Sequence, residues 1–144
     1  MFYPDTFQIS TPTDREIRIT RDFDAPRQLV FDAFTKPELV RRWLLGPPGW
    51  TMPICEIDLK VGGAYRYVWR KEGGRDMGMG GVFQEIVAPE RIVATERFDE
   101  SWYPGDALDT TVFVEISREP IFRIVSPSAT PTAYCDGSAT IGLP

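Results

Sequence analysis

The position of the helical segments is the strongest constraint on the fold, because they follow one strand-like run and precede several others. Residues 16–23 alternate between apolar and polar side chains, which is typical of a half-buried strand. Apolar residues then recur at helical spacing in residues 29–34 and again in 39–44. Helices that are not interleaved with strands predict an antiparallel sheet, here of about six strands, and an α+β fold.

Proline and glycine mark the ends of the predicted elements. The run Asp24-Ala25-Pro26 favours a helix start, and Pro37 separates the two short helices. The later alternating segments predict strands over residues 52–60, 64–71, 82–87, 91–98 and 108–115, with 121–125 as one further candidate. The glycine-rich residues 72–81 predict a hairpin connection between two of these strands.

The chain of 144 residues is long enough for a single core, and no linker divides it. We expect a loose lead-in over residues 1–14 and one domain over 15–116. Residues 117–144 contain only four charged side chains and show neither helical nor strand periodicity after residue 125. They predict an irregular tail.

Composition excludes several classes of protein. The chain has no histidine, so a Ser-His-Asp triad, a Cys-His pair and a histidine zinc site are ruled out. Its formal charge of −5 argues against a general nucleic-acid binder, which needs clustered positive charge. The two cysteines, Cys55 and Cys135, lie far apart in sequence and are expected to be reduced core residues.

No targeting, membrane or cofactor signal is present in the sequence. No stretch approaches the roughly 20 apolar residues of a membrane span. The first residues lack the basic and apolar regions of a signal peptide, so a cytoplasmic location is expected. No carboxylate spacing matches a calcium loop, and we expect neither a metal nor another cofactor.

Two motifs have both a functional and a structural interpretation. The glycines between 73 and 81 suggest a phosphate loop, but their spacing and the absence of a following helix favour a hairpin. Glu56 and Asp58 share a strand face and form a candidate acid–base pair. Lys60 lies on the same face, so a solvated sheet surface is the favoured interpretation.

An aromatic face is the most informative feature of the predicted sheet. Tyr65, Tyr67 and Trp69 recur at period 2 and need a surface to pack against. They form either ordinary core under the helices or one wall of a ligand cavity in which phenol and indole groups serve as polar contacts. We predict that the three rings face the concave side and that Arg66 and Arg70 face solvent, because burying two arginines costs more.

The candidate ligand cavity includes further side chains beyond this face. Five other rings complete it, namely Trp43, Trp50, Phe83, Phe98 and Phe113. Arg21 falls on the apolar face of its strand, where it can bind an anionic head group at the cavity mouth. The alternative is that Arg21 snorkels or pairs with a carboxylate such as Glu96, and Glu96 is the second candidate polar group of the cavity.

Four segments, in this order and spacing, resemble a known family: IRITRDFDAPR (17–27), VFDAFTKPELV (30–40), EIDLKVGGAYR (56–66) and GVFQEIVAPERIV (81–93). Together with Trp43, Thr95 and Glu96, they resemble the activator of heat shock protein 90 ATPase homologue-like domain of the START-like, polyketide-cyclase (SRPBCC) superfamily. The resemblance covers roughly residues 15 to 115. It implies a helix-grip architecture, in which a curved antiparallel sheet wraps a long C-terminal helix around a hydrophobic cavity.

The C-terminal tail departs from the pattern of that family. Residues 126–144 offer no helical period, and Pro127 and Pro131 would each disrupt a helix interior by about 3 kcal/mol. We therefore predict no helix longer than about two turns there, and an apolar sheet face that lacks its usual cover. A second chain can cover such a face, so a homodimer is one expected outcome.

Three functions are consistent with this reading, because the superfamily uses one scaffold for several roles. The first is a non-catalytic protein that carries a small hydrophobic or amphipathic ligand. The second, implied by the family name, is a co-chaperone-like interaction domain with a chaperone partner. The third is a cyclase- or hydrolase-like enzyme that uses cavity tyrosines, Arg21 and Glu96 as acid–base groups; this requires a carboxylate that points into the cavity.

Overall fold

The computed structural model describes residues 6–101, 104–105, 109–116 and 121–127, and for the last of these segments it describes the backbone. The elements in chain order are β1 (Gln8–Thr13), β2 (Glu16–Asp22), α1 (Arg27–Thr35), α2 (Pro37–Trp43), β3 (Trp50–Ile57), β4 (Ala64–Lys71), β5 (Asp76–Val87), β6 (Arg91–Phe98), β7 (Asp109–Ile116) and β8 (Ile121–Pro127). The strands form one sheet in the order β1-β2-β8-β7-β6-β5-β4-β3. Every neighbouring pair is antiparallel, so the predicted α+β class is confirmed.

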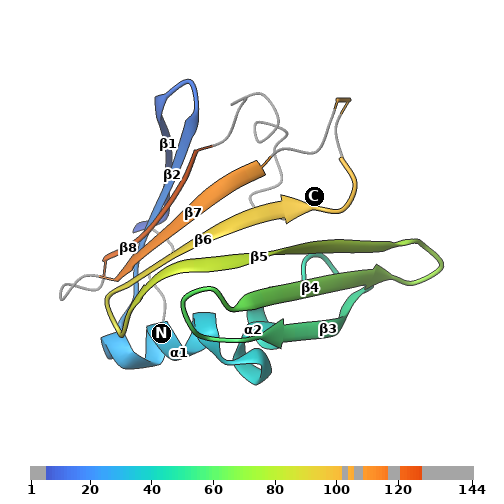
Figure 1. The fold of residues 1–144 in the computed structure, drawn as a ribbon, viewed down its shortest axis with the longest axis horizontal. Helices are drawn as coiled ribbons and strands as arrows, with labels where there is room; N and C mark the ends of the chain where they lie inside the picture. Colours follow the sequence, from blue (N-terminus) through green and yellow to red (C-terminus); the bar gives the residue numbers. More distant parts are fainter. Residues whose placement is uncertain (1–5, 102–103, 106–108, 117–120, 128–144) are drawn as a thin grey trace.

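The sheet is strongly curved, and the two helices cover one end of it (Figure 1). The helix α2 packs against β3, α1 reaches β7, and the two helices pack against each other. This arrangement leaves the inner faces of β2 and of β3 to β7 turned toward a common interior, and the buried core residues lie on these faces and on the two helices.

Proline sets the boundary between the two helices, as the sequence predicts. Lys36, which precedes Pro37, has an extended backbone with φ −98° and ψ 118°. Its N–H still donates to the Asp32 carbonyl, so the same residue ends α1 and begins α2. The helix α1 begins at Arg27, directly after Pro26, without a side-chain cap.

The predicted orientation of β4 is confirmed. Tyr65, Tyr67 and Trp69 are only 7%, 9% and 1% exposed and belong to the core. Arg70 is exposed, and half-buried Arg66 lies on the outer face, where it forms an ion pair with Asp99. The buried core consists of Ile17, Ile19, Val30, Phe31, Val40, Met52, Cys55, Tyr65, Tyr67, Trp69, Met79, Phe83, Ile92, Ala94, Val114 and Ile116.

The sheet is larger than the sequence predicted, with eight strands instead of about six. Residues 8–13, expected to be part of a loose lead-in, form β1 and pair with β2. All six residues of β1 are exposed, so they carry no burial pattern that sequence periodicity could detect. The candidate strand at 121–125 is present as β8, which lies between β2 and β7. The sheet therefore extends beyond the expected limits of 15 and 116 on both sides.

The glycine-rich segment is also different from the prediction, because β5 begins at Asp76 and contains glycines expected in a hairpin. Gly78 lies directly beneath the Arg66–Asp99 ion pair, and a side chain there would come within 2.9 Å of the Arg66 Cζ atom. This glycine therefore serves close packing on the outer face instead of a turn.

The prediction for the end of the chain lies mostly outside the described residues, since it concerns residues 126–144 and the description ends at 127. The expected absence of a long C-terminal helix therefore stays a prediction. Among the described helices, none is both long enough and apolar enough to cross a membrane.

Candidate functional site

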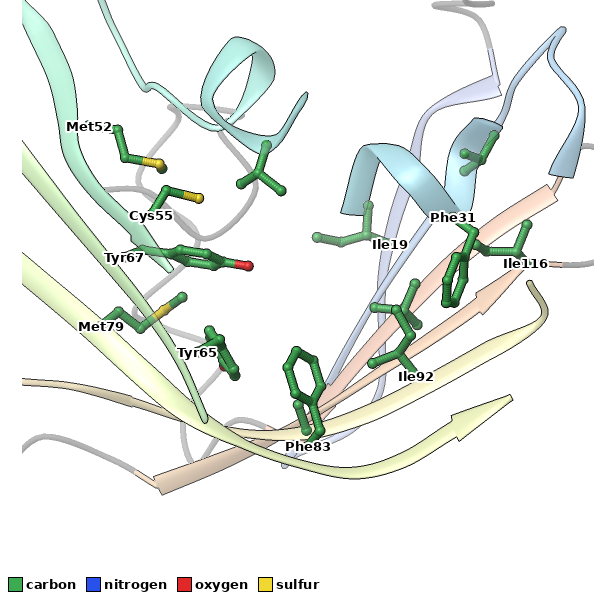
Figure 2. Packing of buried hydrophobic residues seen from close by; sticks show 14 of the residues in the cluster. Ile19, Phe31, Met52, Cys55, Tyr65, Tyr67, Met79, Phe83, Ile92 and Ile116 are labelled. Carbon is green, nitrogen blue, oxygen red and sulfur yellow. The ribbon is translucent and has the colours of Figure 1, made fainter. Parts of the chain in front are cut away.

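The candidate site is the inner face of the curved sheet. Figure 2 shows side chains from β3, β4 and β5, among them Cys55, Tyr67 and Met79, pointing toward the same interior as Ile19 and Phe31 on the other side. The Tyr67 hydroxyl is directed toward the space between these two groups (Figure 2). The face is thus mainly apolar, with few polar groups, which is the composition typical of a small-molecule site.

Tyr65 is held against β6 beside the contact between Val82 and Thr95. The Val82 N–H donates to the Thr95 hydroxyl at 2.9 Å. The Thr95 carbonyl accepts a hydrogen bond from the Tyr65 hydroxyl at 2.7 Å. Opposite Tyr65 on β5 is Gly81, and the Thr95 carbonyl and the Tyr65 ring together occupy the space that a side chain at Gly81 would need. The polar group of Tyr65 is therefore already used within the fold.

Trp69 is likewise satisfied within the fold. Its indole N–H donates to the Leu44 carbonyl at 2.6 Å, which ties β4 to the end of α2. In contrast, the Tyr67 hydroxyl makes no hydrogen bond with any residue that the structure describes. Of the three rings predicted to offer polar contacts, only Tyr67 has its polar atom available to a ligand.

Glu96 supplies a carboxyl group to the same face. It lies on the same face of β6 as Ile92, Ala94 and Phe98, all of which pack in or against the core. The Thr110 hydroxyl on β7 lies 3.3 Å from the Glu96 carbonyl and 3.5 Å from its Oε1 atom. Burial raises the pKa of Glu96 to about 7, against an ordinary value of 4.5.

The phenols beside this carboxyl stay neutral. Burial is the main cause that raises the pKa of Tyr65 and of Tyr67, and the negative charge of Glu96 raises both further. The thiol of Cys55, the cross-strand neighbour of Tyr67, adds to the effect on Tyr67. Burial raises the pKa of Cys55 itself, although Arg41 on α2 opposes the shift. Among the described residues of this face, Glu96 is therefore the group that titrates near neutral pH.

The protonation of Glu96 should make the free energy of unfolding depend on pH. The folded protein keeps the Glu96 proton to about pH 7, whereas an unfolded chain loses it near pH 4.5. Stability contributed by the protonated carboxyl is therefore lost as the pH rises, and between pH 5 and pH 8 the free energy of unfolding should fall by about 2–3 kcal/mol relative to Glu96→Gln. Urea denaturation of both proteins at the two pH values measures this difference. Parallel pH profiles would contradict it.

Arg21 does not approach Glu96, so the alternative in which they pair is wrong. Arg21 aligns with Phe122 of β8, which in turn aligns with Ile116 of β7, whereas Glu96 aligns with Thr110. Ile116, the position of β7 level with Arg21, and Thr110, the position level with Glu96, are six residues apart. This corresponds to about 20 Å along the strand. The Arg21 guanidinium lies 5.8 Å from the ring centroids of both Phe7 and Phe23.

The other predicted rings divide into two groups. Phe83 is buried in the core, and Trp50 and Phe98 are partly buried against it, so the structure brings these three toward the inner face. Phe113 is on the outer face, where its ring lies 5.6 Å from the Arg91 guanidinium, because Val112 and Val114 are the residues of β7 that pack inward. Its assignment to the cavity is wrong.

Trp43 also lies apart from the inner face. It is 39% exposed, and its indole N–H donates to the Ala33 carbonyl at 2.8 Å. Its ring packs edge-on against Phe34 of α1, with 4.8 Å between centroids. Helical spacing placed Trp43 at the end of α2 correctly, and its hydrogen bond and ring contact are both with α1.

Sequence reasoning missed two residues of the site, Gly81 and Thr110. Gly81 provides room for the Tyr65 ring, and Thr110 is the hydrogen-bonding neighbour of Glu96. Both roles depend on strand register, which the alternation pattern alone does not specify. Among the described residues, no group of three Cys, Asp or Glu side chains is arranged to hold a metal ion.

Comparison with known proteins adds to this description. A family model described as "Activator of Hsp90 ATPase homolog 1-like protein" matches residues 24–131. A crystal structure from Rhodobacter sphaeroides is 26% identical, with a TM-score of 0.77 over 92% of this chain and 85% of that one. One from Chromobacterium violaceum is 30% identical, with a TM-score of 0.68 over 83% of this chain and 86% of that one. The AHSA1-like protein from Aeromonas hydrophila shares the fold, with 21% identity and a TM-score of 0.65 over 80% of this chain and 76% of that one. No curated protein matches significantly.

Proposed function

The chain belongs to the Activator of Hsp90 ATPase homolog 1-like family, and on this premise we propose that it binds a small, mainly apolar molecule on the inner face of its sheet. The observation that carries the proposal is the Tyr67 hydroxyl, which lies on a buried ring and has no hydrogen-bond partner among the described residues. The hydroxyl is directed into the interior space and stays accessible there, so it can donate a hydrogen bond to an acceptor group of a ligand.

A direct test uses amide NMR spectra recorded with fatty acids and aromatic polyketides as candidate ligands. We expect shifts around Tyr65, Tyr67 and Trp69, because these residues lie on the proposed binding face. A broad screen in which none of these signals moves would overturn the proposal.

A pair of matched variants separates binding from stability. Tyr67→Phe removes a hydroxyl without a described partner, so ligand affinity should fall about threefold to tenfold while stability is kept. Tyr65→Phe removes the hydroxyl that donates to Thr95, so stability should fall by about 1 kcal/mol while affinity is kept. Calorimetric titration and urea denaturation of the two variants check both halves. Equal affinities for the two variants would contradict the assignment to Tyr67.

Glu96 favours an enzyme as the second candidate function. The enzyme hypothesis requires an inward-facing carboxylate, and Glu96 meets this requirement with a pKa near 7, which suits a general acid or base. Loss of turnover in Glu96→Gln, with ligand binding retained, would support this role once a substrate is found. The co-chaperone alternative follows from the family description alone, and its test is stimulation of a chaperone ATPase by the purified protein.

A further inference from the structure

We infer that the ligand of the inner face carries a protonated amine that binds the Glu96 carboxylate beside Tyr65 and Tyr67. This inference rests on the proposed function and specifies the chemical class of the ligand. It follows from the strand register, the distribution of charge over the two faces of the sheet and the nature of the surrounding rings.

Register places the carboxyl next to the tyrosines. Tyr65 pairs with Gly81 on β5, and Gly80 pairs with Arg97 on β6, so the next position brings Gly81 opposite Glu96. Because Gly81 has no side chain, the Tyr65 ring and the Glu96 carboxyl are not separated by a residue of β5. The negative charge of Glu96 raises the pKa of both tyrosines, which agrees with this proximity.

Charge is distributed differently on the two faces of the sheet. On the outer face Arg91 pairs with Glu85 and Glu115, and Arg97 pairs with Asp109. On the inner face Glu96 forms no ion pair with any residue that the structure describes. Its carboxyl group has the Thr110 hydroxyl 3.5 Å from its Oε1 atom. A half-buried carboxylate in apolar surroundings is costly to ionise unless a cation meets it.

The neighbouring rings favour a cation as the missing partner. The rings of Tyr67 and Phe83 both lie beside the Tyr65 ring. The centroid of the Tyr65 ring is 5.2 Å from that of Tyr67 and 5.4 Å from that of Phe83. Aromatic faces attract ammonium groups, and a carboxylate in the same place adds a charge-assisted hydrogen bond. An ammonium group on an apolar chain would therefore meet both Glu96 and the rings, whereas a fatty-acid carboxylate would meet a like charge.

Three ligands of equal chain length test this inference, namely decylamine, 1-decanol and decanoate. At pH 8, above the pKa of about 7 for Glu96, calorimetric titration should show decylamine binding about tenfold more tightly than 1-decanol, and decanoate most weakly. In Glu96→Gln the preference for the amine over the alcohol should fall to less than about threefold. The control Glu56→Gln removes an exposed carboxylate of β3 and should keep the wild-type preference.

The outcomes distinguish the two proposals. Binding of 1-decanol with no preference for decylamine, or an amine preference that survives in Glu96→Gln, overturns the inference and leaves the proposed function standing. If none of the three compounds shifts the amide signals of Tyr65, Tyr67 and Trp69, the result counts against both. Loss of the amine preference in both the Glu96 and Glu56 variants would show a general charge effect and would also overturn the inference.

Discussion

Replacing Trp69 with alanine should lower the free energy of unfolding by about 3–5 kcal/mol, the range for removing a fully buried large ring. Trp69 is 1% exposed, and its ring packs edge-on against Tyr67 with 6.0 Å between centroids. The variant also leaves the Leu44 carbonyl without the indole N–H that donates to it. Urea denaturation followed by circular dichroism measures the loss.

Two further variants show whether the loss belongs to this position. Trp69→Phe keeps most of the buried ring but removes the N–H donor to Leu44, so it should cost less than Trp69→Ala, about 1–2 kcal/mol. Trp43→Ala makes the same change at a ring that is 39% exposed, and its effect should be well below that of Trp69→Ala. Equal losses for the two alanine variants would contradict the central role of Trp69.

The second large effect is expected at Gly81, where valine should destabilise the fold by about 3 kcal/mol. A Cβ atom at this position would collide with the Thr95 carbonyl and would lie 2.9 Å from the Cε1 atom of Tyr65. The collision with backbone forces β5 and β6 apart, and it displaces the ring whose hydroxyl donates to Thr95. Chemical denaturation measures the loss, and near-ultraviolet circular dichroism should report the displaced Tyr65.

Gly74→Ala provides the matched control, because Gly74 lies in the turn after β4. A Cβ atom there would lie 3.2 Å from the Lys71 Cβ atom and 3.4 Å from the Lys71 carbonyl oxygen, so a few tenths of an ångström of adjustment is enough. Its effect should stay below about 1 kcal/mol. A Gly81→Val variant as stable as Gly74→Ala would show that β5 and β6 are not closely packed at Gly81.

The site could be predicted in part from sequence. The three rings of β4 were assigned to the correct face, because the alternative would have buried Arg66 and Arg70. Glu96 was identified as a polar candidate, but its neighbours were not, because they lie on other strands. The assignment of Phe113 failed because β7 carries apolar residues on both faces, so alternation did not show which face was inward.

The sequence by itself determined the local elements: both helices, their boundary at Pro37, and the strands β4 and β6, whose predicted limits match the structure. These follow from backbone restriction at proline and from side-chain period, which act over a few neighbouring residues. Only the tertiary structure decided that β1 and β8 join the sheet, that Gly78 and Gly81 lie under side chains, and that Glu96 lies beside Tyr65 and Tyr67. The reason is physical: strand pairing and register depend on hydrogen bonds between segments far apart in the chain, and side-chain alternation is the same for every register that keeps the same face inward.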